Sequence, residues 1–276
     1  MENPKSTPTT TSKAMNFEKL RSERMTATLS EHRLRIFDPT RRPKYRKKLR
    51  LESSWGIIEK TGKCGQVHAD FVDAIFYCRE KTAEVRDGRI KLLVDPARVR
   101  RVARISSGSQ LNDLKTEILE VVIKIIEPVE LACEGHIIDH IDIAKHEDGN
   151  GITRFNPLSR RKKDPGLVER ELWRVEVGKA LCKLLYHDLW IGYDPAPIAR
   201  FRHGITQAIA RNILTHKNKP NGGWILDNLI RSVEENLSGT TLRDRRRDVR
   251  NDAEKLKEIG ISIDGDRVHI LKVLDL

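Results

Sequence analysis

The residues best suited to chemistry lie near the end of the sequence, where five arginines fall within the eight positions from Arg243 to Arg250. A guanidinium group can grip guanine O6 and N7, or a phosphate, through two parallel hydrogen bonds. At about 100° per residue, Leu242 and Val249 share one helix face, and Arg243, Arg247 and Arg250 form a stripe beside it. The spacing predicts a helix with a buried apolar face and a cationic stripe suited to nucleic acid.

The boundaries of this helix follow from the residues that flank it. Thr241 and Asp244 have the spacing of a capping box, so we expect the helix to begin at Thr240 or Thr241. Gly260 should end it, because glycine readily adopts the left-handed conformation that follows many helices. The helix thus starts with threonines and carries its arginines from the first turn onward.

The neighbouring elements predict a winged helix-turn-helix. Residues 203–217 and 224–236 have helical patterns, and the breaker "NKPNGG" lies between them. After the arginine helix, Asp264 and Gly265 supply the tight turn of a hairpin. This order would place the arginine helix in the major groove, N-terminal end first, while the hairpin follows the DNA backbone. The DNA contacts predicted in this module are Thr240, Thr241, Arg243, Arg246, Arg247, Arg250 and Arg267.

A solvated charged face is the alternative for the arginine helix. Asp244, Asp248, Asp252 and Glu254 have spacings that allow them to pair with the arginines. The helix follows a helix–turn signal and precedes a hairpin, in a chain of formal net charge +12. That combination favours contact with DNA.

A second segment, residues 62–145, repeats the same order of elements: helix, short strand, helix, turn, helix and hairpin. The stretch "SSGSQLNDLK" would open its third helix, with polar side chains suited to base edges or phosphates. The alternatives are a packed helix with a polar cap, or a domain that mainly dimerises. The candidate DNA contacts here are Ser107, Ser109, Gln110, Asn112 and Lys115.

Composition limits the classes of function. The net charge of +12 over 276 residues favours an acidic partner such as nucleic acid. The sequence has no run of about 18 apolar residues, so we expect no membrane span. The opening "MENPKSTPTTTSKAMNF" lacks the apolar core of a secretory signal. The four cysteines form no CxxC pair and are interpreted as reduced thiols of a cytoplasmic protein.

The predicted fold class is α+β, mainly helical, with two tandem winged-helix domains behind a disordered basic tail. Residues 1–50 are rich in Pro, Ser and Thr and then in Lys and Arg, a composition typical of disorder. Residues 51–155 would form the first winged-helix domain, for dimerisation or DNA contact. Residues 156–276 would form the second, which is the main DNA-binding domain, after a basic connection "NPLSRRKKDPG".

The succession "ELWRVEVGKALCKLLYHDLW", "FRHGITQAIARNILTHK", the arginine helix and "LKEIGISIDGDRVHI" resembles the plasmid replication initiators with paired winged-helix domains, especially the TrfA type. The resemblance covers roughly residues 60–276 by layout. It implies binding to direct repeats (iterons) at a plasmid origin, opening of adjacent AT-rich DNA and a role in copy-number control. It also implies recruitment of host replication proteins, among them the sliding clamp, helicase and initiator, and allows a homodimer.

One N-terminal stretch, "HRLRIFD", is similar to the peptide by which such initiators engage the bacterial sliding clamp. Leu34, Ile36 and Phe37 match its apolar positions, and Arg33 stands where glutamine is usual. A short apolar peptide in a disordered tail can order on binding a groove. The alternative is a chance apolar triplet that packs on the first domain.

Two further clusters suggest other chemistry. Cys133, His136 and His140 lie close together, but no fourth zinc ligand is evident. Tyr186 in "LLYHD" has the type of a nucleophile, although its apolar helical setting favours core packing. The sequence contains no GxxxxGK[ST] motif for ATP. We therefore expect a non-enzymatic DNA-binding initiator without metal or cofactor; a winged-helix transcriptional regulator and a rolling-circle endonuclease are the alternatives.

Overall fold

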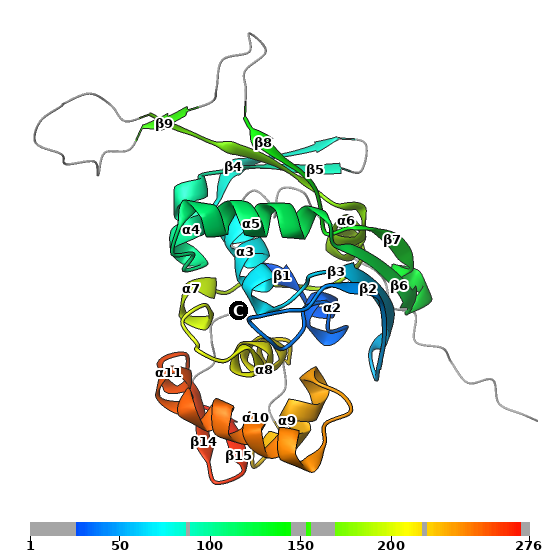
Figure 1. The fold of residues 1–276 in the computed structure, drawn as a ribbon, viewed down its shortest axis with the longest axis vertical. Coiled ribbons are helices and arrows are strands. Elements are labelled where there is room, and N and C mark those ends of the chain that lie inside the picture. The colour runs from blue at the N-terminus through cyan, green and yellow to red at the C-terminus, as the bar shows by residue number, and fades with distance from the viewer. Residues whose placement is uncertain (1–25, 87–88, 145–152, 156–168, 217–219, 272–276) are drawn as a thin grey trace, which may run out of the picture.

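Two hydrophobic clusters organise the fold (Figure 1). The first gathers buried side chains between Leu34 and Leu185. The second contains Ala27, Leu29 and buried side chains from Ile191 to Val268. The computed structural model describes residues 26–86, 89–144, 153–155, 169–216 and 220–271.

Antiparallel sheets enclose the first cluster together with four helices. The first sheet has the order β2-β3-β6-β7, and the second has the order β4-β5-β11-β8. The fold is therefore α+β as expected, but the expectation of a mainly helical chain is not confirmed. The strands are β2 (Arg46–Ser53), β3 (Gly56–Gly62), β4 (Arg79–Arg86), β5 (Arg89–Val94), β6 (Val122–Glu127), β7 (Cys133–His136), β8 (Ile138–Ile143) and β11 (Trp173–Val177), with β9 (Thr153–Phe155) and β10 (Glu169–Glu171) as a separate pair.

Helix α3 (Gln66–Tyr77) is the centre of this unit. Its side chains are buried on every face, as expected of a helix enclosed by other elements, and they include the carboxylates of Asp70 and Asp73. Charged groups with no access to water need partners, so these two aspartates determine what packs against α3. The other helices of the unit are α4 (Pro96–Val102), α5 (Gly108–Leu119), the 3-10 turn η1 (Val129–Leu131) and α6 (Lys179–His187).

The prediction of a disordered tail over residues 1–50 is wrong for residues 26–50; residues 1–25 lie outside the described part. Strand β1 (Ala27–Thr28) pairs with β12 (Trp190–Ile191), and helix α2 (Leu29–Arg33) follows behind a capping box at Thr28. The clamp-like residues are no free peptide, because at most 5% of each side chain is exposed and all three pack in the first cluster. These residues are Leu34, Ile36 and Phe37. Apolar burial thus outweighs the polar composition around them.

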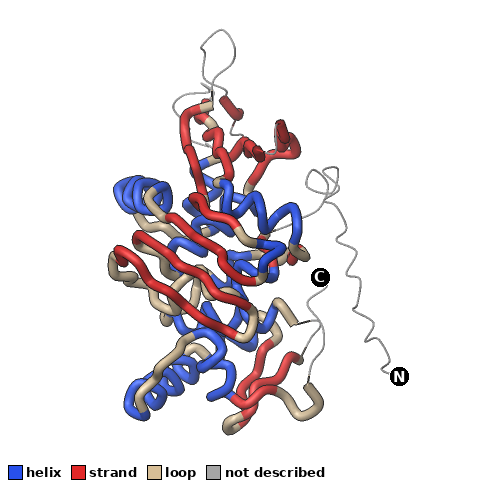
Figure 2. The backbone as a smooth tube through the Cα atoms, turned by 90° about the vertical axis from the view of Figure 1, so that its right-hand side faces the viewer, coloured by secondary structure: helices blue, strands red, loops and turns tan. Residues whose placement is uncertain are grey.

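Most of the second cluster lies within a module that we call the C-terminal module, residues 204–270, and Ala27, Leu29, Ile191, Ile198 and Phe201 complete it. Its strands form a three-stranded antiparallel sheet of order β13-β15-β14, and Figure 2 shows this sheet apart from those of the first cluster. The helices and hairpin expected in this region are confirmed. The elements are α8 (Gly204–Leu214), β13 (Trp224–Ile225), α9 (Leu226–Val233), α10 (Gly239–Asn251), α11 (Ala253–Glu258), β14 (Ile261–Asp264) and β15 (Arg267–Ile270); the short helix α7 (Pro195–Ile198) precedes them.

The predicted domain boundary at residue 155/156 does not separate the two clusters. Strand β11 pairs with β5 and β8, and α6 places Leu181, Leu184 and Leu185 in the first cluster. The hairpin expected after α5 is also different, because β6 pairs with β3 and β7 while β8 joins the other sheet. Both the domain boundary and the pairing of the strands after α5 therefore depend on contacts between strands that are far apart in the sequence.

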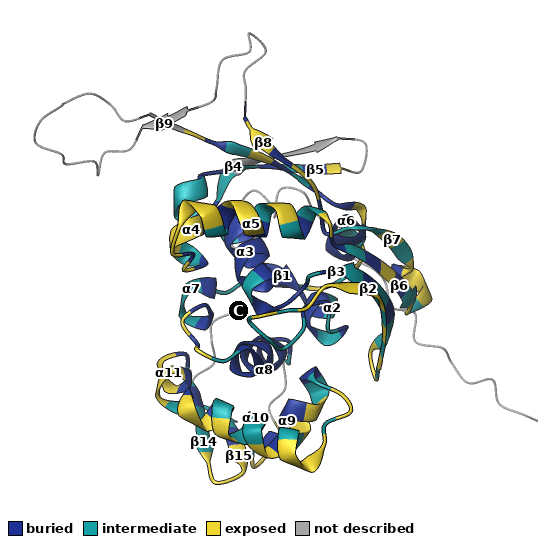
Figure 3. Cartoon of the chain, viewed as in Figure 1, coloured by how far each residue is buried: buried dark blue, intermediate teal, exposed yellow. Residues whose placement is uncertain are grey.

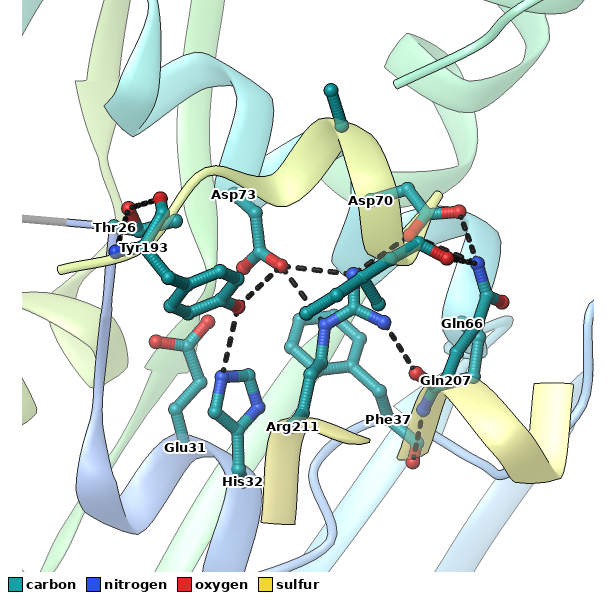
Figure 4. A network of polar contacts seen from close by, with 12 residues as sticks. Thr26, Glu31, His32, Phe37, Gln66, Asp70, Asp73, Tyr193, Gln207 and Arg211 are labelled. Carbon is teal, nitrogen blue, oxygen red and sulfur yellow. Dashed lines mark hydrogen bonds and ion pairs between the residues drawn. The ribbon is translucent and has the colours of Figure 1, made fainter. Parts of the chain in front are cut away.

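A buried polar network joins the C-terminal module to the first unit (Figure 4). The guanidinium of Arg211, on α8, donates to Asp73 at 2.9 Å, to Asp70 at 2.7 Å and to Gln66 at 2.7 Å. Tyr193 donates its hydroxyl to the same Asp73 oxygen at 2.7 Å. The Arg211 side chain is only 1% exposed, so these contacts replace water completely.

No helix in the described part of the chain has the length and apolar character needed to cross a bilayer.

Replacing Arg211 with alanine is expected to lower the free energy of unfolding by about 3–5 kcal/mol, because Asp70 and Asp73 would stay buried without their cation. Urea denaturation followed by circular dichroism measures this loss. The control is Arg231→Ala on α9, an exposed site where the change should stay within about 0.5 kcal/mol. Equal losses in the two variants would contradict the structural role given to Arg211.

Glu31 gives a pH-dependent prediction. Burial, followed by the charge of Asp73, raises the pKa of Glu31 from 4.5 to about 8. The folded protein then binds a proton that the unfolded chain releases, so this contribution to stability is full below pH 4.5 and is lost as the pH rises towards 8. Glu31→Gln cannot ionise, and its amide oxygen can still accept from the backbone of Thr28.

The variant and the native protein should therefore have similar melting temperatures near pH 4.5, and the variant should be the more stable at pH 8. Melting curves over this pH range provide the measurement. Parallel profiles for the two proteins would show that Glu31 is ionised in the folded state.

Candidate nucleic-acid interface

Helix α10 presents one face to the core and the opposite face to solvent (Figure 3). Leu242 and Val249 are 6% and 1% exposed, which confirms the apolar face expected from their spacing. The helix begins one to two residues earlier than predicted, because Ser238 is its N-cap and accepts a hydrogen bond from the backbone of Thr241 at 3.1 Å. Thr240 is left exposed on the first turn.

The helix also ends earlier than predicted, at Asn251 rather than near Gly260. The cause is Asp252, whose buried carboxylate accepts from the backbone of Arg202 at 3.3 Å and of His203 at 3.1 Å. This contact ties the end of α10 to the start of α8 and lets α11 continue in another direction. The arginine face is thereby confined to α10.

Two arginines of α10 hold the helix to α9 instead of facing a partner. Arg245 makes two hydrogen bonds to Glu234, at 2.6 and 2.7 Å. Arg246 makes the same two-bond contact with Asp227, and these hydrogen bonds lower the pKa of that carboxyl. Arg246 thus helps to position α10 against α9, and its contact with DNA stays a prediction.

The remaining arginines lie on the solvent side. Arg247 pairs with Asp244 at 3.2 Å within the helix, and its side chain is 67% exposed. Arg250 pairs with Asp266 of the hairpin turn at 2.7 Å and is 47% exposed. Exposed pairs of this kind contribute about 0–1 kcal/mol, so a phosphate or base can displace the carboxylate. The alternative of a solvated, paired face is thus realised in part, through Asp244.

Arg243 and Arg267 differ from these four, since each is exposed and makes no ion pair within the described residues. Arg243 lies on the same face as Arg247, one turn nearer the start of α10. Arg267 opens strand β15 and lies beside the turn that Arg250 contacts. Together with Thr240 and Thr241, these arginines form the surface that we call the α10 face: Thr240, Thr241, Arg243, Arg247, Arg250 and Arg267.

Helix α5 corresponds to the second candidate set, and its polar start serves mainly as a cap. Ser107 accepts from the backbone of Gln110 at 3.1 Å, and Gln110 accepts from the backbone of Ser106 at 3.0 Å. Lys115 is half-buried, with its ammonium 5.7 Å from the ring centre of Trp173. Only Ser109 and Asn112 of the predicted set are exposed without such a role.

A basic groove beside α5 was missed by the sequence interpretation. It has a volume of about 510 Å³ and is lined by Arg100, Arg101 and Arg104 of α4 and the following turn, with Ser106 at its end. The stretch "DPARVRRVAR" places these three arginines among apolar residues, and this composition is the signal for the groove in the sequence.

The other candidate chemistry finds little support. His140 pairs with Asp142 at 2.5 Å, and the described residues contain no group of three side chains arranged for a metal. Tyr186 packs against the first cluster, and burial, followed by the nearby Cys182, raises the pKa of its hydroxyl. A raised pKa opposes the ionisation that a tyrosine nucleophile requires.

The pairing of Arg246 with Asp227 predicts a measurable coupling. Arg246→Ala and Asp227→Ala should each lower the free energy of unfolding, and the double variant should lose no more than either alone. The coupling energy is expected to be about 1 kcal/mol, because the pair is two-bonded but partly exposed. Arg243→Ala is the control and should leave stability unchanged. Additive losses would show that the two side chains do not interact.

Comparison with known proteins identifies two similar solved structures, both of domains 2 and 3 of RctB. The selenomethionine form has a TM-score of 0.48 at 10% identity, over 88% of this chain and 96% of that chain. The other has a TM-score of 0.41 at 12% identity, over 83% of each chain. No protein-family model matches the sequence, and no curated protein matches it significantly. The resemblance to the TrfA type therefore stays a prediction from the sequence.

Proposed function

We propose that this chain is a sequence-specific DNA-binding protein that initiates replication, and that its C-terminal module is a winged helix. The observation that carries the proposal is the order α8, β13, α9, α10, β14, β15, with the strands in one sheet of order β13-β15-β14. In such a module the third helix enters the major groove and the hairpin lies along the backbone. The RctB structures have TM-scores below 0.5, so the proposal rests on this module alone.

The α10 face has the chemistry that this docking requires. Thr240 and Arg243 lie on the first turns of α10, the end that enters the groove, and Arg247 follows one turn later. A guanidinium that leaves a weak surface pair can form two bonds to a guanine edge, which is worth about 1–3 kcal/mol of discrimination. Arg267 lies on the hairpin, where a backbone phosphate is expected.

The ion pairs between α10 and α9 prepare the α10 face for binding to DNA. Arg245 and Arg246 fix α10 on α9, so the helix meets DNA as a rigid body. A preorganised surface loses less conformational entropy on binding than a mobile one.

As an initiator, the protein would bind direct repeats (iterons) at a plasmid origin, promote opening of AT-rich DNA and act in copy-number control in the cytoplasm. The sequence has no ATP-binding loop, so opening would draw on binding energy through bending of a deformable site. We propose no enzymatic step. Recruitment of host replication proteins would have to use a surface other than Leu34, Ile36 and Phe37, which are buried.

Arg243→Ala and Arg247→Ala should each weaken binding to the specific site by about 1–3 kcal/mol and relax the preference at one base pair, if the side chain reads a base. Gel-shift titrations on the native site and on single-base variants measure both effects. Lys257→Ala on α11, an exposed cation of the same module, is the control. A uniform loss on all sequences would reassign the residue to a phosphate.

Footprinting and permanganate probing of the DNA that flanks the gene test the initiator role. The proposal predicts protected repeats at regular spacing, with reactive thymines in an adjacent AT-rich tract. Protection of a promoter without open DNA would make the protein a transcriptional regulator. A metal-dependent nick that is lost in Tyr186→Phe would make it an endonuclease.

A further inference from the structure

The largest concentration of positive charge lies outside the α10 face. Residues 39–51 contain seven lysines and arginines and no carboxylate, against a formal net charge of +12 for the whole chain. Helix α10, by contrast, carries five arginines and two aspartates. More than half of the net charge therefore belongs to the start of strand β2 and the loop before it.

Most of these cations are exposed and available (Figure 3). Arg42, Lys44, Arg46 and Lys47 are exposed and make no ion pair within the part of the chain that the structure describes. The exceptions lie at the two ends: Arg41 pairs with the buried Asp70, and Lys48 and Arg50 pair with carboxylates near β3. The free cations thus form one continuous run over residues 42–47, which we call the β2 basic strip.

A groove connects this strip to the arginine helix. It has a volume of about 440 Å³, with Arg42, Lys44 and Arg46 on one wall and Asn236 and Arg245 of the α9–α10 region on the other. The sugar-phosphate backbone of a DNA strand that approaches the first turn of α10 from the side of β2 would pass along this groove.

The carboxylates that line the groove should not repel a phosphate, because each of them is paired with a cation. Glu234 is paired with Arg245, Glu235 with Arg35, and Asp38 with Lys60. Each acid is neutralised by a cation outside the β2 basic strip, so the strip keeps its full charge. The potential in a groove lined in this way is positive, and it attracts phosphates.

We propose that the β2 basic strip binds the phosphate backbone of the same duplex that the α10 face contacts, as a second, sequence-independent DNA surface. The inference rests on the proposed function and extends it to residues outside the C-terminal module. It assigns most of the non-specific affinity to the strip and most of the base discrimination to α10.

Protection of an exposed sheet edge is the simpler explanation for these cations, because β2 is the outer strand of its sheet. It accounts for charge on the strand itself. It does not account for Arg42 and Lys44, which precede the strand and line the groove instead. The position of the cations relative to α10 therefore favours DNA.

The test uses the full chain with Arg42→Ala, Lys44→Ala and Arg46→Ala combined, and a mixed-sequence duplex of about 30 base pairs as the probe. Affinity is measured by fluorescence anisotropy over a series of salt concentrations. Removing three phosphate contacts should reduce the magnitude of the negative slope of log affinity against log salt by about 2–3. It should also weaken binding at least tenfold at low salt. Melting curves verify that the variant is folded.

A matched variant, Arg89→Ala with Lys124→Ala and Lys179→Ala, removes three cations elsewhere in the first unit and should keep the native slope. An unchanged slope in the strip variant would overturn the inference, while a loss of specific binding in Arg243→Ala would still uphold the proposed function. If the strip variant lost affinity only for a single-stranded oligonucleotide, the assignment to duplex would be wrong. If Arg243→Ala had no effect and only the strip mattered, the proposed role of α10 would fail instead.

Discussion

The buried contact of Arg211 with Asp70 and Asp73 is the constraint on which the rest of the structure depends. The aspartates lie on the central helix of the first unit, and the arginine lies on α8, the first helix of the C-terminal module. A buried ion pair adds little net stability over apolar packing, but breaking it is costly. The contact therefore favours the packing of α8 against α3, in which the buried charges of Asp70, Asp73 and Arg211 are paired. All elements that follow α8 inherit their orientation from it.

From that starting point, the arginines of the C-terminal module divide into two roles. Those that point towards other elements, Arg245 and Arg246, make two-bond contacts with carboxylates of α9 and its end. Those that point to solvent make weak pairs or none. A helix with five guanidinium groups can thus be firmly packed and still present free cations, because the acids are placed selectively. The β2 basic strip also keeps its cations free, since the acids of its groove are neutralised by other cations.

Local sequence patterns predicted the features of the structure that depend on residues close together in the chain. The apolar face of α10, the hairpin at Asp264 and Gly265, and the helix over residues 203–217 were all recoverable from spacing and turn residues. The partners of the charged side chains were not, because they lie far away in the chain: Asp227 is 19 residues from Arg246, and Asp73 is 138 from Arg211. Nothing in the local sequence of α8 marks Arg211 as buried.

The wrong prediction of disorder for residues 26–50 has a related cause. Composition over residues 1–50 is polar and basic, yet three apolar side chains between 34 and 37 complete the first cluster. The triplet is visible in the sequence, and packing on the first domain was one alternative for it, but the polar composition of the whole segment favoured a disordered tail. The strand order had the same difficulty, since β11 pairs with β5, which lies about eighty residues earlier in the chain. Pairings of this length depend on the whole fold and not on any local motif.

Methylation interference distinguishes entry of α10 into the major groove of a duplex from other modes of binding. Methylation of guanine N7 modifies the major groove, whereas methylation of adenine N3 modifies the minor groove. If α10 lies in the major groove, guanine N7 methylation within the bound site blocks binding of the native protein, and this interference at one guanine disappears in Arg243→Ala or Arg247→Ala. Binding that tolerates guanine N7 methylation throughout the site would contradict this position of α10.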